Sequence, residues 1–510
     1  MPTTAPRILF LGLDGGTRVV FDPLFDRGWM PRLESFWRRS ARGNLRSTTP
    51  MVTPVAWTSF LTGCTPVRHG IHDFCWYDAR TRTVGFNHAE RVAVPTLWHL
   101  LDRLDRPVVS LNLPMTYPAP RIQGIVVSGA ESPDRSAAFR QCPDFGRELA
   151  CLVPEYSPKN IWKRRPRTLE DLRGLARLTR EIFLAQARAA ERADAQVDWS
   201  VLMVHFHLLD GLQHRVWPEM GLDPDVRPRT EWSAEVEGCF RALDEAVGRL
   251  LELAARRNAA IVAVSDHGFG PCRALVSVNG LLERGGYQRR LRYGTRFRYR
   301  YHRLRHRYAR WRLRNNPEAA AALPRPVAGE VGCDWRHTTA FAPFGQLAAL
   351  VCVEPGRTQR SRLAAEVAAY LADCRDPETG SRLFADAFPV AERYGLDPAE
   401  HGLPDVLAPS ADGYQAQAKW SPFDDRWFAS DPDLPATHTQ YGIVAIDAPG
   451  IGAGDRLAGE LPDVAPTALA LLGIDAPEYM EGRSLIPEDR VPSARPRRDG
   501  HAAAYPHHVR

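Results

Sequence analysis

Short runs of apolar residues alternate along the chain with longer stretches in which apolar residues recur at helical spacing. A run that is apolar at nearly every position is typical of a strand buried on both faces, as in a parallel sheet. The pattern therefore predicts an α/β fold with a mostly parallel sheet sandwiched by helices. The apolar runs cover residues 7–13, 107–113, 124–129, 199–206, 259–265 and 442–447, and the helical stretches cover 94–104, 168–193, 233–257 and 463–473.

Two long segments do not follow this alternation. Residues 131–195 are helical and polar and are expected to form a cap. Residues 285–435 begin with a strongly basic segment and continue into a mixed stretch, 338–357, which is expected to hold a few antiparallel strands. The end of the chain is rich in Pro, Arg and His and is predicted to be disordered. The predicted organisation is a catalytic core made of 1–130, 196–284 and 436–487, a helical cap 131–195, an inserted α+β subdomain 285–435 and a tail 488–510.

Composition narrows the class of protein only modestly. The 510 residues carry a formal net charge of +6, which is too small for this length to imply nucleic acid by itself. The nine cysteines lie far apart without a C-x-x-C pair, which favours reduced thiols and a cytoplasmic location over disulfides or a thiolate metal site. The first apolar run is too short for a signal sequence, and no run approaches the ~20 residues that span a bilayer.

Potential metal ligands follow three of the predicted strands, and another one precedes the last strand. Each of them alone has an ordinary explanation, such as a helix cap or a solvated ion pair. Because the carboxyl ends of parallel strands meet at one edge of a sheet, we expect these side chains to converge. Carboxylates and imidazoles suit zinc or manganese at a catalytic site, and their number suffices for two divalent ions, with zinc favoured. The residues are Asp14, Asp210, His214, Asp266, His267 and His438.

A candidate nucleophile stands at the start of a short predicted helix. Thr53 and Pro54 open this helix, and Gly63 ends it. A hydroxyl at a helix N-terminus lies beside unpaired backbone N–H groups and the positive end of the helix dipole. Such a place suits an attacking alkoxide and a bound phosphoryl oxygen, although Thr53 is also what an ordinary N-cap looks like.

A second candidate nucleophile lies just beyond that helix. Residues 64–68 read C-x-P-x-R, the pattern that in sulfatases marks a cysteine converted to formylglycine. In sulfatases this cysteine precedes the helix, whereas here Cys64 follows the "LTG" of residues 61–63. That order places Cys64 about a helix length from the catalytic end, so we interpret the match as coincidental and a sulfatase as disfavoured.

Taken as an ordered set, these motifs resemble the alkaline phosphatase superfamily. More narrowly, they are similar to its type I phosphodiesterases and nucleotide pyrophosphatases and to predicted phosphohydrolases and phosphomutases of the same superfamily. The resemblance covers both ends and the middle of the predicted core and is thin over 131–195 and 285–435. The motifs that carry it are Asp14, Thr53, "FLTGCTPVRHGI" (60–71), "NLPMTYP" (112–118), Asp210 with His214, "SDHGF" (265–269), His438 and "DVAPTALALLGI" (463–474).

The resemblance implies a role for each ligand. Asp14, Thr53, Asp266 and His267 would surround one metal, and Asp210, His214 and His438 would hold the other. Thr53 would attack phosphorus and form a phosphothreonine, which water then hydrolyses. The implied function is a two-metal phosphoric ester hydrolase that acts on a small anionic substrate. A phosphodiesterase is favoured over a phosphomonoesterase. A phosphomonoesterase or phosphomutase is the alternative within the superfamily.

The chain departs from the nucleotide pyrophosphatase pattern around the nucleophile. Those enzymes resemble T-x-P-N-H after the nucleophile and carry an asparagine beyond "HGI", and this chain has neither. The candidates for binding the substrate are therefore Asn112, Asp73 and Trp57. Because the oxygen-binding asparagine has no clear counterpart, specificity for nucleotides does not follow from the resemblance.

The basic segment 289–314 contains twelve arginines interleaved with Tyr, Phe and Trp. One interpretation is a solvated helix, and another is electrostatic guidance of an anionic substrate. Arginine with stacking aromatics also suits single-stranded nucleic acid, and a basic amphipathic helix suits an anionic membrane. A non-catalytic protein that binds a partner through this segment is the alternative of another class.

Overall fold

The computed structural model describes residues 6–78, 83–223, 228–290, 301, 304–305, 307–309, 311–312, 333–344, 357–398, 400–418, 427–487 and 490. Most of the predicted basic segment 289–314 and nearly all of the predicted tail 488–510 lie outside these residues.

An eight-stranded sheet forms the centre of the molecule, with strand order β17-β2-β16-β8-β1-β7-β5-β6. All of the strands predicted from apolar runs lie in this sheet. β16 runs antiparallel to both of its neighbours, and every other pairing is parallel, so the predicted α/β class is confirmed. The strands are β1 (Ile8–Gly12), β2 (Ala41–Arg46), β5 (Val108–Leu111), β6 (Gly124–Val127), β7 (Val201–His205), β8 (Ala260–Val264), β16 (Tyr441–Asp447) and β17 (Arg456–Glu460).

Two strands of this sheet, β2 and β17, were not predicted. They lie together at one edge of the sheet, and several of their side chains are exposed or only half-buried. A strand with so little apolar surface to bury has no apolar run, so the pattern of the sequence does not distinguish it from a loop.

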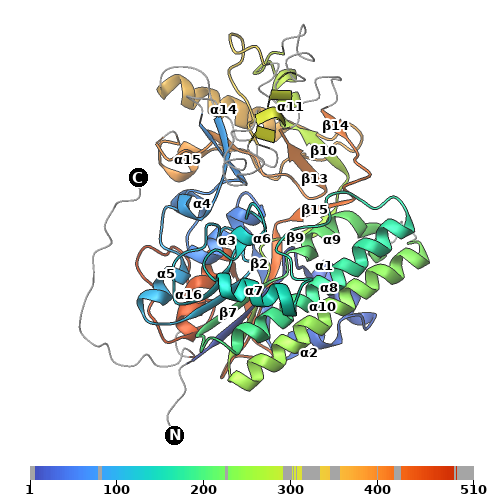
Figure 1. Ribbon diagram of the computed structural model, residues 1–510. Coiled ribbons are helices and arrows are strands. Elements are labelled where there is room, and N and C mark those ends of the chain that lie inside the picture. The colour runs from blue at the N-terminus through green and yellow to red at the C-terminus, as the bar shows by residue number, and fades with distance from the viewer. Residues whose placement is uncertain are drawn as a thin grey trace.

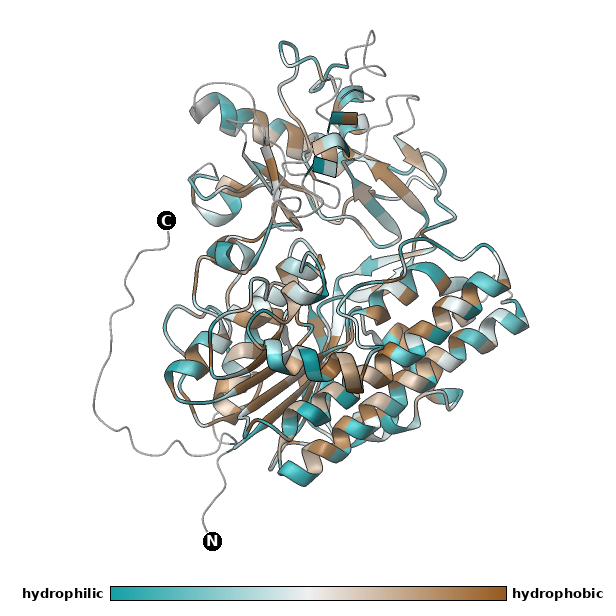
Figure 2. Ribbon diagram, viewed as in Figure 1, coloured by the Kyte–Doolittle hydropathy of each residue, from teal (hydrophilic) through white to brown (hydrophobic). Residues whose placement is uncertain are grey.

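Helices cover both faces of the sheet (Figure 1). Because side chains alternate along a strand, Leu9 and Leu11 of β1 pack on one face, whereas Ile8 and Phe10 pack on the other. Figure 2 shows that the central strands are hydrophobic, whereas the helices around them carry both hydrophobic and hydrophilic residues. The first face is covered by α1 (Arg18–Asp26), α2 (Pro31–Arg39), α7 (Pro143–Leu152), α8 (Leu169–Asp194) and α10 (Thr230–Arg257), and the second by α3 (Thr53–Thr62), α5 (Leu97–Arg103) and α16 (Val464–Leu471).

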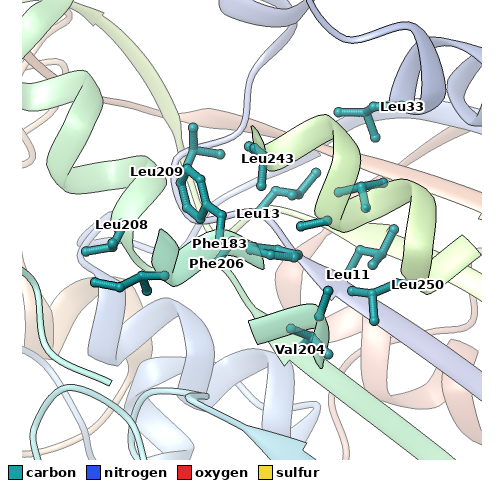
Figure 3. Close-up of a cluster of buried hydrophobic side chains, with 14 of the residues drawn as sticks. Leu11, Leu13, Leu33, Phe183, Val204, Phe206, Leu208, Leu209, Leu243 and Leu250 are labelled. Carbon is teal, nitrogen blue, oxygen red and sulfur yellow. The ribbon is translucent and has the colours of Figure 1, made fainter. Parts of the chain in front are cut away.

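The longest helix of segment 131–195 does not have the position expected of a cap. α8 packs along α10 and against β5 and β7, as a layer helix of the core. Its buried stripe includes Ile182 and Phe183, and Phe183 meets Phe206 edge to face, with ring centroids 5.9 Å apart (Figure 3). A continuous apolar stripe of this kind is stable when another layer of the core covers it. The prediction of a cap followed from the polar composition of the whole segment, which hides the stripe.

A smaller subdomain sits beyond one end of the sheet (Figure 1). It begins earlier than expected, because β10 and α11 share a hydrophobic cluster with α14 and β13. Of the predicted strands in 338–357, residues 338–344 are not in strand conformation and 345–356 lie outside the described residues. Its elements are β10 (Ala274–Ser277), α11 (Val278–Arg284), α14 (Arg357–Asp373), β11 (Phe388–Pro389), α15 (Val390–Tyr394), β12 (Val406–Leu407), β13 (Tyr414–Gln417) and β14 (Phe428–Ala429).

Short elements connect the subdomain and the sheet to the rest of the chain. β9 and β15 pair antiparallel, with His438 opposite Phe269, where the chain enters and leaves the subdomain.

Within the described parts of the chain, no helix combines the length and the apolarity needed to cross a membrane. The remaining elements are α4 (Pro66–His69), β3 (Cys75–Asp78), β4 (Thr83–Phe86), α6 (Arg135–Ala138), α9 (Leu208–Val216), β9 (Gly268–Pro271) and β15 (Ala436–Thr439).

Candidate metal centre and nucleophile

The ends of β1 and β8 bring two carboxylates together. The strands are neighbours, and Asp14 and Asp266 each follow one of them after a single intervening residue. The N–H of Gly15 donates to Asp266 Oδ1 over 3.1 Å. Gly15 has a φ of +71°, and a Cβ at this position would lie 2.6 Å from the Phe269 ring. A glycine is therefore required for the turn that holds the two carboxylates side by side.

His267 completes a first group of ligands with these carboxylates. Its Nε2 lies 3.6 Å from Asp14 Oδ1 and 3.2 Å from Asp266 Oδ2. All three residues are buried, and their ligand atoms lie within 4.8 Å of one another. This is the predicted first group, apart from Thr53.

A second group lies beside the first. Asp210, His438 and His267 place one ligand atom each within 4.8 Å of one another, so His267 borders both groups. The Nε2 of His214, one helical turn after Asp210 on α9, lies 3.3 Å from Asp210 Oδ1 and 3.0 Å from His438 Nε2. The structure thus brings together all the residues that were predicted as ligands of the second metal.

Backbone carbonyls determine which nitrogen of each imidazole faces the cluster. Nδ1 donates to Ala436 O over 2.8 Å in His214, to Met51 O over 3.0 Å in His438 and to Gly268 O over 3.2 Å in His267. Because a carbonyl oxygen only accepts, Nδ1 carries the proton, and Nε2 of a neutral ring presents a lone pair. In metal-binding proteins, histidines are commonly oriented in this way, with one ring nitrogen donating to a backbone carbonyl and the other facing the metal.

The charges of the cluster also fit cations. Burial raises the pKa of Asp14, with further increases from Asp266 and Asp210, and burial raises the pKa of Asp266 to about 7. Oδ1 of Asp14 and Oδ2 of Asp266 are buried without a hydrogen-bond partner. Burial opposes ionisation of Asp210, but His214 and His438 hold its pKa well below the usual value. Such unpaired buried oxygens beside imidazole lone pairs are the donors that zinc and manganese bind.

Thr53 is the first residue of α3, not its N-cap. The capping position is Val52, whose side chain makes no capping hydrogen bond. The Thr53 hydroxyl instead lies 3.5 Å from His267 Nε2, at the border of the two ligand groups. The hydroxyl is therefore placed to react at the cluster, at the N-terminal and positive end of α3.

The three residues predicted to bind the substrate do not join this cluster. Trp57 is fully buried in the core and meets the His205 ring edge-on, with centroids 4.7 Å apart. Asn112 is also fully buried, and its Oδ1 accepts from Tyr156 over 2.5 Å. The carboxylate of Asp73 is bound locally, since Oδ1 accepts from the N–H of Phe74 over 2.6 Å. Trp57 and Asn112 thus lie next to His205, Trp57 through its ring and Asn112 through its backbone carbonyl.

Asp73 gives a prediction for stability. Burial raises its pKa from the usual 3.8 to about 7. Between these two pH values the carboxyl group is protonated in the folded protein but ionised in the unfolded chain. The contribution of this proton to the free energy of unfolding is therefore present in full below about pH 4 and is lost as the pH rises through 7. We expect Asp73→Asn to raise the melting temperature at pH 8 but not at pH 4, as measured by thermal unfolding. An equal shift at both values would contradict the assignment.

His205 is a residue that the sequence analysis missed. It ends β7, is fully buried, and places Nε2 3.0 Å from Asp14 Oδ2. Its Nδ1 donates to the backbone carbonyl of Asn112 over 3.1 Å. The signal was available in the sequence, because His205 stands at a strand end by the same rule that identified Asp14.

Cys64 lies at the opposite end of α3 from Thr53. The helix is ten residues long, about 15 Å at 1.5 Å per residue. Burial, with Glu481 nearby, raises the pKa of the thiol to about 11, and Sγ points at the carbonyls of Thr62 and Tyr479. A protonated, buried thiol is a poor nucleophile.

Replacing Cys64 by serine should therefore leave turnover within about twofold of wild type, because the thiol lies at the far end of α3 and bonds to the backbone carbonyls of Thr62 and Tyr479. Steady-state hydrolysis of a nitrophenyl ester measures this directly. A loss of several orders of magnitude, with the fold intact by circular dichroism, would restore the sulfatase-type cysteine as a candidate nucleophile.

A cleft between the core and the inserted subdomain reaches the second ligand group. Its walls come from the chain just before Thr53, from β13 and from β15, and they include Met51, Pro409, Tyr414, Gln415 and His438. The inserted subdomain therefore forms one side of the space next to a predicted metal ligand.

Comparison with protein families gives one match over most of the chain. The family described as type I phosphodiesterase / nucleotide pyrophosphatase matches residues 8–433.

Two curated relatives match only short segments. A 2,3-bisphosphoglycerate-independent phosphoglycerate mutase of Ruegeria sp. (strain TM1040) is 32% identical over 90 residues, which are 17% of this chain and 18% of the relative. The corresponding mutase of Rhodopirellula baltica (strain DSM 10527 / NCIMB 13988 / SH1) is 38% identical over 61 residues, 11% of each chain.

Solved structures with the same fold cover nearly the whole chain. Phosphonoacetate hydrolase from Sinorhizobium meliloti 1021, in complex with phosphonoformate, has 16% identity and a TM-score of 0.57 over 92% of this chain and 96% of that one. Murine ectonucleotide pyrophosphatase / phosphodiesterase 5 has 12% identity and a TM-score of 0.52 over the same shares. At such low identity the likeness shows the fold, which is that of the alkaline phosphatase superfamily.

Proposed function

Because the chain belongs to the type I phosphodiesterase / nucleotide pyrophosphatase family, we propose that it is a two-metal phosphoric ester hydrolase with Thr53 as nucleophile. The observation that carries the proposal is the convergence of the Nε2 atoms of His214, His267 and His438 on buried carboxylates beside the Thr53 hydroxyl. The unpaired buried oxygens of Asp14 and Asp266 cost stability unless a cation binds them.

Two metal ions, zinc or manganese, would supply Lewis-acid stabilisation of the oxygens that enter and leave phosphorus. Asp14, Asp266 and His267, together with Thr53, would hold one ion, and Asp210, His214 and His438 the other. The donor set fits zinc, which takes carboxylate and imidazole ligands at catalytic sites.

The chain's own residues account for the rest of the proposed mechanism. Thr53 forms a bond from Oγ1 to phosphorus as the ester oxygen leaves, and water then cleaves the phosphothreonine and restores the hydroxyl. The positive end of the α3 dipole favours negative charge on the phosphoryl oxygens, although Pro54 has no N–H and the N–H of Val55 already donates to the carbonyl of Val52. The carbonyls of Met51, Gly268 and Ala436 hold the imidazoles in place, so little rearrangement is needed during turnover.

The surroundings of the cluster favour a diester over a monoester. Among the described residues, the direct ion pairs of Asp14, Asp210 and Asp266 are made with histidines, and the half-buried Arg215 acts on Asp210 only from a longer distance. A monoester dianion carries more negative charge than a diester and gains more from a cationic side chain beside its free oxygens. We therefore propose phosphodiester hydrolysis as the main activity.

Metal analysis combined with two chromogenic substrates tests the proposal. We expect about two zinc or manganese ions per chain and faster hydrolysis of bis-nitrophenyl phosphate than of nitrophenyl phosphate. A preference for the monoester would favour a phosphomonoesterase or phosphomutase, which the short matches to two phosphoglycerate mutases also allow. Protein without metal and without turnover, after incubation with both ions, would overturn the enzyme assignment.

A further inference from the structure

The second group of ligands is divided between two elements that are far apart in the sequence. Asp210 and His214 lie on α9, whereas His438 lies on β15. The distances between their ligand atoms therefore depend on how α9 and β15 are placed relative to each other. Before β15 runs the return segment, residues 431–435, through which the chain comes back from the inserted subdomain. This segment belongs to no helix or strand, so its position depends on contacts with its neighbours.

Two consecutive residues of α9 bind backbone carbonyls of this part of the chain. His214 Nδ1 donates to Ala436 O over 2.8 Å, and Arg215 Nη1 donates to Asp433 O. The two carbonyls are three residues apart, one in the return segment and one at the start of β15. Two such points of attachment fix both the position and the direction of the chain along α9, which a single hydrogen bond does not.

The guanidinium of Arg215 also reaches a third part of the chain. Its Nε donates to Trp162 O and its Nη2 donates to Lys163 O, each over 3.3 Å. This half-buried side chain thus binds three carbonyls from two distant loops with one planar group. Arginine suits this role, because its donors are fixed in one plane, whereas lysine offers a single nitrogen.

Two further arginines bind the return segment from the loop that follows α7. Arg165 Nη1 donates to Pro432 O over 3.4 Å, while its Nη2 pairs with the buried Glu219 over 2.7 Å. Arg167 pairs with the carboxylate of Asp433 over 2.8 Å. The return segment is therefore held by arginines from both α9 and this loop.

We propose that Arg215 is a positioning residue for the second metal ion. By binding Asp433 O, it keeps β15 at the distance from α9 at which His438 meets the other two ligands of that group. The inference rests on the proposed function, because it requires that the group binds an ion. The alternative is that Arg215 acts through its charge, which reaches Asp210 from a longer distance. A lysine keeps the charge and loses the planar set of donors, so Arg215→Lys separates the two explanations.

Zinc affinity of the full chain tests the proposal, measured by competition with a chromophoric chelator. We expect Arg215→Lys to weaken the binding of one ion by about tenfold or more, as the loss of outer contacts does at metal sites. The other ion should bind as in wild type. The double variant Arg215→Lys, Asp210→Ala should still retain the ion of the first group, because both changes act on the second.

The matched control is Arg27→Lys. Arg27 also binds two backbone carbonyls, those of Met220 and Gly221, beyond the end of α9. This variant should bind both ions with the affinity of wild type.

The melting temperature separates positioning of the ion from support of the fold. An ion that binds only the folded state raises the melting temperature, so each variant is compared in zinc and in excess chelator. We expect a smaller zinc-induced rise for Arg215→Lys than for wild type, whatever the change in the metal-free protein. An undiminished rise beside a lower melting temperature in both conditions would assign Arg215 to the fold alone.

Chemical rescue gives a second, independent measurement. Arg215→Ala should lose the same ion, and added methylguanidinium should restore part of its binding, because it supplies the missing planar donors. Methylammonium carries the same charge and should not restore it. Rescue by both cations alike, or by neither, would overturn the proposal.

Two results for Arg215→Lys would also overturn this inference while leaving the proposed function intact. One is two ions bound with the affinity of wild type. The other is loss of both ions where Asp210→Ala loses only one. Wild-type protein that binds no metal would instead overturn the proposed function, and this inference with it.

Discussion

Thr53→Ala should lower phosphodiester turnover by roughly three orders of magnitude or more, because it removes the atom that bonds to phosphorus. The hydroxyl lies at the border of both ligand groups, 3.5 Å from His267 Nε2. The other predicted ligands are unchanged, so metal content should stay near two ions per chain. Hydrolysis of bis-nitrophenyl phosphate and elemental analysis of the same preparation measure both quantities.

Two variants serve as controls for this loss. Thr53→Ser keeps a hydroxyl at the site and should retain a measurable part of the activity. Thr58→Ala makes the same chemical change on the same helix, where the hydroxyl donates to Pro54 O over 2.6 Å, and should remain active. Turnover by Thr53→Ala close to that of wild type would exclude a covalent role for Thr53 and would favour direct attack by water.

Asp210→Ala and His438→Ala should each lower metal content from about two ions toward one and abolish most of the turnover. Both side chains belong to one ligand group, in which Asp210 Oδ1 lies 3.1 Å from His438 Nε2. Removing either leaves that ion with too few ligands, whereas the group of Asp14, Asp266 and His267 is untouched. Elemental analysis after dialysis against a weak chelator measures the loss.

His337→Ala is the matched control, because this exposed imidazole pairs with Asp334 far from any predicted ligand. It should retain both ions and full turnover. Metal content equal to wild type in Asp210→Ala and His438→Ala would show that the second group binds no ion. Loss of both ions together would instead show that the two groups depend on each other through His267, which borders both.

The sheet and the place of the site could be predicted from the sequence. Strands buried on both faces must be apolar at nearly every position, so β1, β5, β7, β8 and β16 left clear runs. The ligands follow such runs directly, and the topology of parallel strands brings their ends together. β17 at the edge of the sheet and β2 beside it could not be recognised, because half-exposed strands leave no such run. α8 was misplaced as a cap because local composition does not show which neighbour buries an apolar stripe.

The identity of the candidate ligands and nucleophile is thus a property of the sequence, because each stands at a fixed offset from a strand or a helix start. Their orientation was decided only by tertiary structure. His438 is held by the carbonyl of Met51, and His214 by the carbonyl of Ala436, over separations that no local pattern encodes. The burial of Trp57 and Asn112 behind His205 likewise follows from packing between distant segments. Local chemistry specifies which groups are present, and long-range packing determines which of their atoms meet at the site.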